Sequence, residues 1–383
     1  MKIDIIDICK QIEDPRLDRK KVHKMEHIIY IAISAVICGA QSWNEIEAFG
    51  HSKIDFFKKR LPDLVSIPSH DTFNRFFSIL DPQHFELIFR NWVKQICDKI
   101  EGVVAIDGKL MRGSSKCDAE HTTGREGFKL WMVSAWSAAN GISLGQEKVE
   151  EKSNEIEAVP RLISALSLEE CIVTIDAMGC QTTITEEIMK RKGDYIIALK
   201  ENQPKSYELA RKLVESFKNS PRHKIAATHT SETTGHGRTE TRTCLVINYG
   251  ADIMEHMFKG KFVGLKSIVG VTSERIVHAT GEITEETRYY ITSLGNNNPE
   301  EVANAIRQHW SIENNLHWQL DVTFHEDQSK KVRNAARNFS ALTKMALAVL
   351  KNDKATKGSM NLKRLKAGWD DNYLSRLMQS SAF

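Results

Sequence analysis

Two short, mainly apolar runs that each end in an aspartate constrain the fold of this chain most strongly. Residues 103–106 (Val-Val-Ala-Ile) precede Asp107-Gly108, and residues 171–175 (Cys-Ile-Val-Thr-Ile) precede Asp176. A short apolar run that stops at a turn signal is typical of a buried β-strand. If the two strands are neighbours, both carboxylates emerge at the same edge of a sheet. The pattern therefore predicts a sheet that carries two acids on one edge.

The surrounding patterns predict a mixed α/β sheet covered by helices. Residues 129–138 and 142–149 flank Asn140-Gly141, which is a strong signal for a β-hairpin. Three strands of antiparallel type followed by alternating helices and strands match such a sheet. The other predicted elements are helices at 155–166, 183–192 and 201–219, a strand at 195–199, strands of a β-rich insertion at 239–248, 262–272 and 287–293, and a helix from Glu300 past Glu313.

The first 98 residues follow a helical pattern. The apolar run Ile28–Ala40 is 13 residues long, too short to cross a bilayer, and predicts a buried helix. Residues 68–77 predict a capped helix. In one interpretation it is the second helix of a helix-turn-helix that exposes Ser69, His70, Asn74 and Arg75 to DNA. The favoured interpretation is an ordinary helix that packs Phe73, Phe76 and Phe77 inward.

Charge is distributed unevenly, although the net charge is only +3. Residues 328–383 hold 12 Lys and Arg against 3 Asp and Glu, whereas the other 327 residues hold 41 against 47. A basic C-terminal segment indicates either a polyanionic partner or a solvated helical surface. The seven cysteines form no CxxC pair, which argues against a disulfide framework and a structural zinc site. With no signal segment, the chain is expected in the cytoplasm, without a membrane partner.

The two strand-end acids suggest metal chemistry. Carboxylates a few ångströms apart must share a proton or hold a cation between them. Mg²⁺ suits such a site because it takes few carboxylates and keeps water and phosphate in its shell. Two such ions can activate water and stabilise the leaving oxygen in phosphodiester chemistry. The alternative is that Asp107 and Asp176 only cap the turns that follow their strands.

A third acid, Glu313, lies in a helical pattern over residues 307–321, close to His309 and His317. An acid among apolar residues and histidines is costly unless it is paired or bound to metal. An exposed Glu on an amphipathic helix is the simpler interpretation. A zinc site of His309, Glu313 and His317 is less favoured, because the HExxH order is absent and the strand aspartates would stay unexplained.

Several motifs in order resemble one family. They are Ala-Ile-Asp-Gly-Lys (105–109), Lys-Ser-Asn-Glu-Ile (152–156), Ile-Asp-Ala-Met-Gly-Cys-Gln (175–181), Ala-Leu-Lys-Glu-Asn-Gln (198–203) and the run from His309 to Phe324. Over nearly its whole length the chain resembles the H-repeat-associated DDE transposases of the insertion-sequence As1 type, which belong to a larger group with a ribonuclease H-like core.

This resemblance implies a fold and a function. The fold would be a ribonuclease H-like mixed sheet with a β-rich insertion and a helical N-terminal domain. Asp107, Asp176 and Glu313 would bind Mg²⁺, or Mn²⁺, for DNA cleavage at insertion-sequence ends and strand transfer into target DNA. A homodimer on DNA is compatible with this function. The expected parts are a helical domain that contacts DNA ends (1–98), the first part of the core (99–222), the insertion (223–295), and the C-terminal helices with the third carboxylate and a basic tail (296–383).

The chain departs from the pattern around its third acid. Relatives in the wider group carry Arg four residues before the Glu and Lys seven after it, whereas this chain has His309 and Leu320. A basic side chain near the phosphates is therefore either supplied from elsewhere or missing. Lys200 is the favoured candidate, ahead of Lys109 and Arg112, and the alternative is that all three are solvated loop cations. The remaining candidate DNA contacts are His309, Arg238, Lys330, Lys331, Arg333 and Arg337. The Gly235–Arg238 loop that carries Arg238 could equally be a plain hairpin turn.

Nearby acids and other functions stay open as alternatives. Asp321, Glu326 and Asp327 could replace Glu313 as ligand, although Asp321 should face elsewhere on an ideal helix. A decayed relative that only binds DNA is one alternative function. A nuclease that cuts without joining is another.

Overall fold

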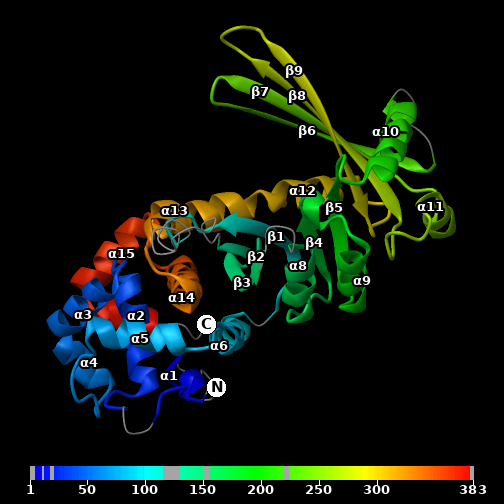
Figure 1. Ribbon diagram of the computed structural model, residues 1–383. Helices are drawn as coiled ribbons and strands as arrows, with labels where there is room; N and C mark the ends of the chain where they lie inside the picture. Colours follow the sequence, from blue (N-terminus) through cyan, green and yellow to red (C-terminus); the bar gives the residue numbers. More distant parts are fainter. Residues whose placement is uncertain are drawn as a thin grey trace, which may run out of the picture.

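A nine-stranded mixed sheet forms the centre of the computed structural model (Figure 1). The structure describes residues 5–10, 13–17, 21–97, 99–114, 130–149, 155–218 and 224–379. The strand order is β3-β2-β1-β4-β5-β9-β8-β7-β6. The strands are β1 (Gly102–Leu110), β2 (Trp131–Ser137), β3 (Ile142–Val149), β4 (Cys171–Ile175), β5 (Asp194–Leu199), β6 (Ala226–Gly235), β7 (Arg238–Ile247), β8 (Ser267–Val277) and β9 (Ile283–Thr292).

The first five strands form the core of the fold. β1 runs antiparallel to β2 and parallel to β4, and β5 is parallel to β4. Alternate residues of β1 face opposite sides of the sheet. Val103 packs with Val302 of α12 (Pro299–His309), whereas Val104 belongs to the large core that includes Leu162 of α8 (Glu155–Ser164) and Ile184 of α9 (Thr182–Lys190). This arrangement confirms the predicted ribonuclease H-like mixed sheet covered by helices.

The β-rich insertion continues the same sheet as a long antiparallel ribbon, β6 to β9, that projects from the core (Figure 1). β9 joins it to β5. Sequence patterns missed β6 because its side chains are polar and mostly exposed, so it has no apolar alternation. They also began the next strand at 262 instead of 267, because Phe262 packs in the core beside a short helix, α11 (Ala251–Met257). The helix α10 (Pro204–Lys218) packs against this ribbon.

The described residues of the N-terminal part form six helices. They are α1 (Ile5–Cys9), α2 (Met25–Ile37), α3 (Trp43–Ser52), α4 (Ile54–Arg60), α5 (His70–Ile79) and α6 (Pro82–Ile96). Ser69 caps α5 by accepting a hydrogen bond from the amide of Thr72, and Phe73, Phe76 and Phe77 are buried. The interpretation of α5 as a capped helix that packs its aromatic side chains inward is therefore confirmed. No helix in the described ranges is long and apolar enough to span a membrane.

The C-terminal helices pack back onto the N-terminal ones. They are α13 (Trp318–Val322), α14 (Arg333–Asn352), α15 (Met360–Trp369) and α16 (Asp371–Gln379), and the short 3₁₀ turn η4 (Glu326–Gln328) precedes α14. α14 contacts α2, α5 and α6 as well as β3, so it joins the N-terminal helices to the sheet. In Figure 1, α14 and α15 lie beside the N-terminal helices.

This packing buries part of the basic tail that the charge count predicts. Lys344, Lys363 and Arg364 are buried, and two of them bind backbone carbonyls at helix ends. Lys363 donates to the carbonyl of Leu350, and Arg364 donates to that of Val36, at 3.0 and 3.1 Å. Cations satisfy the free carbonyls at helix C-termini, and a charge count cannot separate such residues from solvated ones. Cys117 and residues 152–154 of one family motif lie outside the described residues.

Candidate active site

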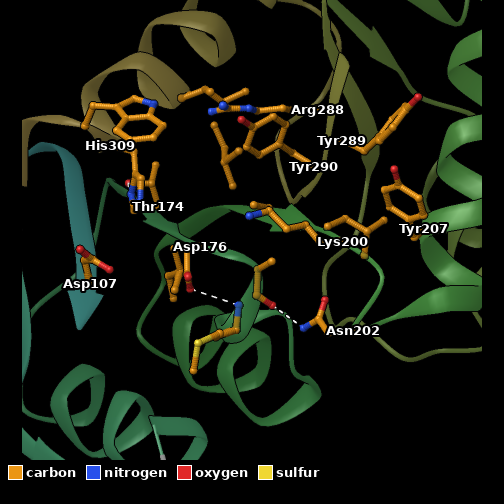
Figure 2. Close-up of a pocket in the computed structure, with 18 of the residues that line it drawn as sticks. Asp107, Thr174, Asp176, Lys200, Asn202, Tyr207, Arg288, Tyr289, Tyr290 and His309 are labelled. Carbon is orange, nitrogen blue, oxygen red and sulfur yellow. Dashed lines mark hydrogen bonds between the residues drawn. The ribbon is translucent and has the colours of Figure 1, made fainter. Parts of the chain in front are cut away.

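Asp107 and Asp176 lie side by side at one edge of the sheet. Ile106 pairs with Ile175 in the parallel register of β1 and β4, so the two aspartates take the next equivalent positions. Neighbouring strands are about 4.8 Å apart. Both residues line a cavity of about 830 Å³ (Figure 2). The prediction that the two acids lie close together is therefore confirmed, but the predicted strand end at Asp107 is wrong, because β1 continues to Leu110 in its pairing with β2.

Asp176 also caps the turn that follows its strand. Its Oδ1 accepts a hydrogen bond from the amide of Met178 at 3.1 Å, at the start of a 3₁₀ turn, Ala177–Gly179. Capping uses one carboxylate oxygen, so it is compatible with a cation at the other. The capping interpretation and the metal interpretation of this aspartate are thus not exclusive.

Glu313 reaches the same cavity from a helix with an irregular turn. After α12, residues Glu313–His317 form one π-helical turn that leads into α13. Such single turns are rare and are frequent at functional sites. Glu313 lines the cavity together with Asp107 and Asp176. Within the described ranges, however, no three His, Cys, Asp or Glu side chains lie close enough to hold an ion.

The donor set fits a hard divalent cation in type and in place. Carboxylate oxygens are the protein ligands that Mg²⁺ prefers, and two of them share the sheet edge. For a complete three-carboxylate site, the three carboxylates have to come closer together than they lie in this structure.

Two neutral histidines flank the acids. His309 Nδ1 lies 3.0 Å from the hydroxyl of Thr174, and burial lowers the pKa of His309 although Asp176 opposes this shift. His317 Nδ1 lies 3.4 Å from Asp107 Oδ2. Burial, Lys344 and Lys109 lower the pKa of His317 to about 4. Both imidazoles are therefore uncharged at neutral pH, and neither supplies the missing positive charge.

Lys200 lines the cavity from the loop after β5 (Figure 2). Asn202 donates to the carbonyl of Ala177, and Gln203 donates to that of Cys180, both at 2.7 Å. These bonds attach the loop that carries Lys200 to the loop that follows Asp176. Two of the sequence motifs are thus in direct contact.

Lys109 does not line this cavity. Its ammonium lies 2.7 Å from Asp321, 3.0 Å from Glu326 and 3.3 Å from Asp327, and its side chain is 12% exposed. Burial alone would lower the pKa of Lys109, but these carboxylates raise it above its usual value. The three acids are bound to Lys109 instead of facing the cavity. Arg112 is exposed and lies 3.7 Å from Asp327.

The predicted C-terminal cations lie elsewhere. Lys330 and Arg333 are exposed, but neither lines the cavity of the aspartates. Lys331 donates to the carbonyl of Gln41 at 2.6 Å and lies 3.5 Å above the ring of Phe339. Burial lowers its pKa to about 7. Arg337 lines a small cleft beside Glu86, away from the aspartates.

Arg238, a predicted DNA contact, lines an arginine-rich groove on the insertion that the sequence did not indicate, which we call the insertion groove. Its volume is about 730 Å³, and it shares Arg288, Ile306 and Trp310 with the cavity of the aspartates. Its arginines are Arg238, Arg242, Arg275, Arg288 and Arg307. The alternation Arg238-Thr-Glu240-Thr-Arg242 in β7 was the available signal, because residues two apart share one face of a strand.

Charges in the insertion groove are only partly balanced. Glu240 lies 2.6 Å from Arg242 and 3.9 Å from Arg275, Glu286 lies 2.8 Å from Arg288, and Glu285 also lines the groove. Burial lowers the pKa of Arg242, and the charges of Arg307 and Arg275 add to this shift against the opposing effect of Glu240. The guanidinium of Arg288 lies 5.6 Å from the ring of Trp310, which is 44% exposed. A polyanion would relieve the repulsion among these arginines.

Comparisons with known proteins now identify the family. Residues 98–350 match the family model of the transposase DDE domain, and residues 6–93 match the model of the domain associated with it. This chain is a member of the DDE transposase family. It is 38% identical to "Putative transposase YncI" of Escherichia coli O157:H7, over 98% of this chain and 94% of that one.

Other similar proteins extend this result. "H repeat-associated putative transposase YhhI" of Escherichia coli K12 is 38% identical, over 97% of this chain and 96% of its own. "Inactive transposase YbfQ" of the same strain is 43% identical over 17% of this chain and 77% of its own. Among solved structures, a piggyBac transposase synaptic complex with hairpin DNA matches 98% of this chain and 78% of its own, with 10% identity and a TM-score of 0.42. The resemblance inferred from the motifs is confirmed, and a DNA transposase role follows from the family.

Proposed function

We propose that this family member is a catalytically active transposase. It cleaves DNA at the ends of its insertion sequence and joins the freed 3′ ends to target DNA. One observation carries the proposal: Asp107 and Asp176 lie in register at the edge of a cavity that Glu313 and Lys200 also line. Acids at this sheet edge, with a cation beside them, are what metal-dependent phosphodiester chemistry needs.

Asp107, Asp176 and Glu313 would hold Mg²⁺ or Mn²⁺. A divalent cation bound there lowers the pKa of water and stabilises the leaving oxygen. The chain positions the reacting groups and neutralises charge. The hydrogen bonds that attach the Lys200 loop to the Asp176 loop keep the Lys200 side chain on the same side of the sheet as the acids. Lys200 would neutralise charge that develops on the phosphate.

The DNA backbone would run from the cavity into the insertion groove. The two hollows share Arg288 and Trp310, so one strand can occupy both without a break. Phosphate contacts from arginine provide affinity without reading sequence. His309 and the exposed Arg112, Lys330 and Arg333 are further candidate contacts. A homodimer that pairs two ends in the cytoplasm is compatible with this function.

A strand-transfer assay tests the proposal. The substrates are a duplex from the DNA that flanks the gene and a supercoiled target plasmid. In Mg²⁺ the protein should cleave the duplex and join it to the plasmid, and in excess EDTA it should do neither. The Asp176→Asn variant keeps the shape of the side chain but loses its charge, so it should bind the duplex and leave it intact.

Each alternative predicts a different result. Cleavage without joining would indicate a nuclease. Binding without cleavage by the wild-type protein would indicate a decayed relative, as the name of one similar protein suggests for that protein. Either result would refute the proposal.

A further inference from the structure

We propose that Lys109 is a positioning residue that fixes the helix of Glu313 against the strand of Asp107. This inference rests on the proposed function. Lys109 lies two residues after Asp107 on β1, and Asp321 lies eight residues after Glu313, at the end of the same helical segment. The Lys109–Asp321 ion pair, with an N–O distance of 2.7 Å, therefore ties the elements that carry the first and third carboxylates.

The Lys109 ammonium is held rigidly because a second partner, Glu326, is buried. Glu326, 3.0 Å from the Lys109 ammonium, has a side chain that is only 4% exposed. It also accepts a hydrogen bond from Ser340 of α14 at 2.8 Å. A buried carboxylate held by two donors has little freedom to move. Lys109 is thus attached to the helical body that α14 joins to the sheet.

A close backbone approach supports the same junction. A Cβ atom on Gly113 would lie 2.5 Å from the carbonyl oxygen of Ser329 and 2.7 Å from that of Asp327. Only glycine permits this approach. The segment after β1 and the segment after the Glu313 helix therefore interlock beside the Lys109 ion pairs.

The contacts of Lys109 argue against a direct role in binding phosphate. Three carboxylates already surround its ammonium, and its side chain is 12% exposed. Without that ammonium, Asp321, Glu326 and Asp327 would repel one another and push the end of the Glu313 helix away from β1. Because Mg²⁺ tolerates little deviation from its ideal geometry, such a displacement would weaken metal binding. Partners outside the ligand shell typically change metal affinity or activity by about 10- to 100-fold.

Three variants test this inference: Lys109→Met, Lys109→Arg and the control Lys99→Met. Lys99 also forms an ion pair, 2.7 Å from Glu170, but it is 60% exposed and lies at the opposite end of β1. The measurements are Mn²⁺ affinity by electron paramagnetic resonance, the cleavage rate of the flanking duplex, and duplex affinity in EDTA. Circular dichroism checks folding.

Lys109→Met should weaken Mn²⁺ binding and slow cleavage, each by about 10- to 100-fold, and leave duplex affinity in EDTA unchanged. Lys109→Arg should restore most of both, since it restores the charge, and Lys99→Met should match wild type. If Lys109→Met does not fold, Asp321→Asn removes one contact and should weaken Mn²⁺ binding several-fold.

Two results would overturn the inference. One is wild-type Mn²⁺ affinity in Lys109→Met, or in Asp321→Asn if that variant is needed. The other is a loss of duplex affinity without a loss of Mn²⁺ affinity, which would make Lys109 a phosphate contact. A wild-type protein that binds no Mn²⁺ would instead refute the proposed function, and this inference with it.

Discussion

Replacing Glu86 with glutamine should stabilise the fold at pH 8 much more than at pH 5. Glu86 lies on α6 and is 5% exposed, and its carboxylate accepts a hydrogen bond from the amide of Gln146 at 2.8 Å. Burial raises its pKa from 4.5 to about 7, against the opposing effects of that bond and the charges of Arg90 and Lys344. The folded protein therefore holds a proton at this site that the unfolded chain releases at a lower pH.

The sign and size follow from proton linkage. The folded pKa is the higher one, so the free energy of unfolding falls as pH rises from 4.5 through 7. Each unit of pKa difference corresponds to about 1.4 kcal/mol. Because of Glu86, the free energy of unfolding should therefore fall by roughly 2–3 kcal/mol between pH 5 and pH 8. Glutamine does not titrate, so the Glu86→Gln variant should lack this loss.

Urea unfolding of wild type and variant at both pH values measures the effect. Other titrating groups cancel in the difference between the two proteins. The Glu208→Gln variant, at a surface position, is the control and should not flatten the pH dependence. An equal fall in stability for wild type and Glu86→Gln would contradict the reasoning, because Glu86 would then be ionised in the fold at no cost.

Two further predictions concern DNA. Lys200→Ala should slow strand transfer at least as much as it weakens duplex binding, measured by joining assays and titrations, because a cation at the reacting phosphate stabilises developing charge; wild-type rates would exclude this role. Replacing either Arg238 or Arg307 in the insertion groove should reduce the slope of log duplex affinity against log salt concentration by about one. Lys331→Ala, at a half-buried position, should leave that dependence unchanged, and the reverse pattern would return the DNA surface to the C-terminal segment.

Local patterns predicted the part of the site that lies on the sheet. The strand at 171–175 was predicted with the bounds that β4 has, because a mainly apolar run ends at an aspartate. The placement of Asp107 beside Asp176 was predicted only on the condition that the two strands are neighbours, a condition that β1 and β4 meet. Parallel strands are buried on both faces, so they appear in a sequence as nearly continuous apolar runs that are simple to recognise.

Features that depend on contacts between distant segments were not predictable. Lys109 and Asp321 are far apart in sequence, and the π-helical turn at Glu313 alters the helical phase that an ideal helix would give Asp321. Lys331 was predicted as a DNA contact, and Lys344 counted toward the basic tail, because a charge count carries no information on burial. The insertion groove was missed because its arginines come from β7, β8, β9 and α12.

The central claim is that Asp107, Asp176 and Glu313 together form one metal site. Anomalous scattering from Mn²⁺ tests this claim most directly. Crystals grown with Mn²⁺ and the flanking duplex should show an anomalous peak roughly 2.0–2.2 Å from carboxylate oxygens of both aspartates. Glu313 should have moved close enough to complete the shell. A peak bound by His309 and His317 instead, or no peak at this sheet edge, would contradict the account.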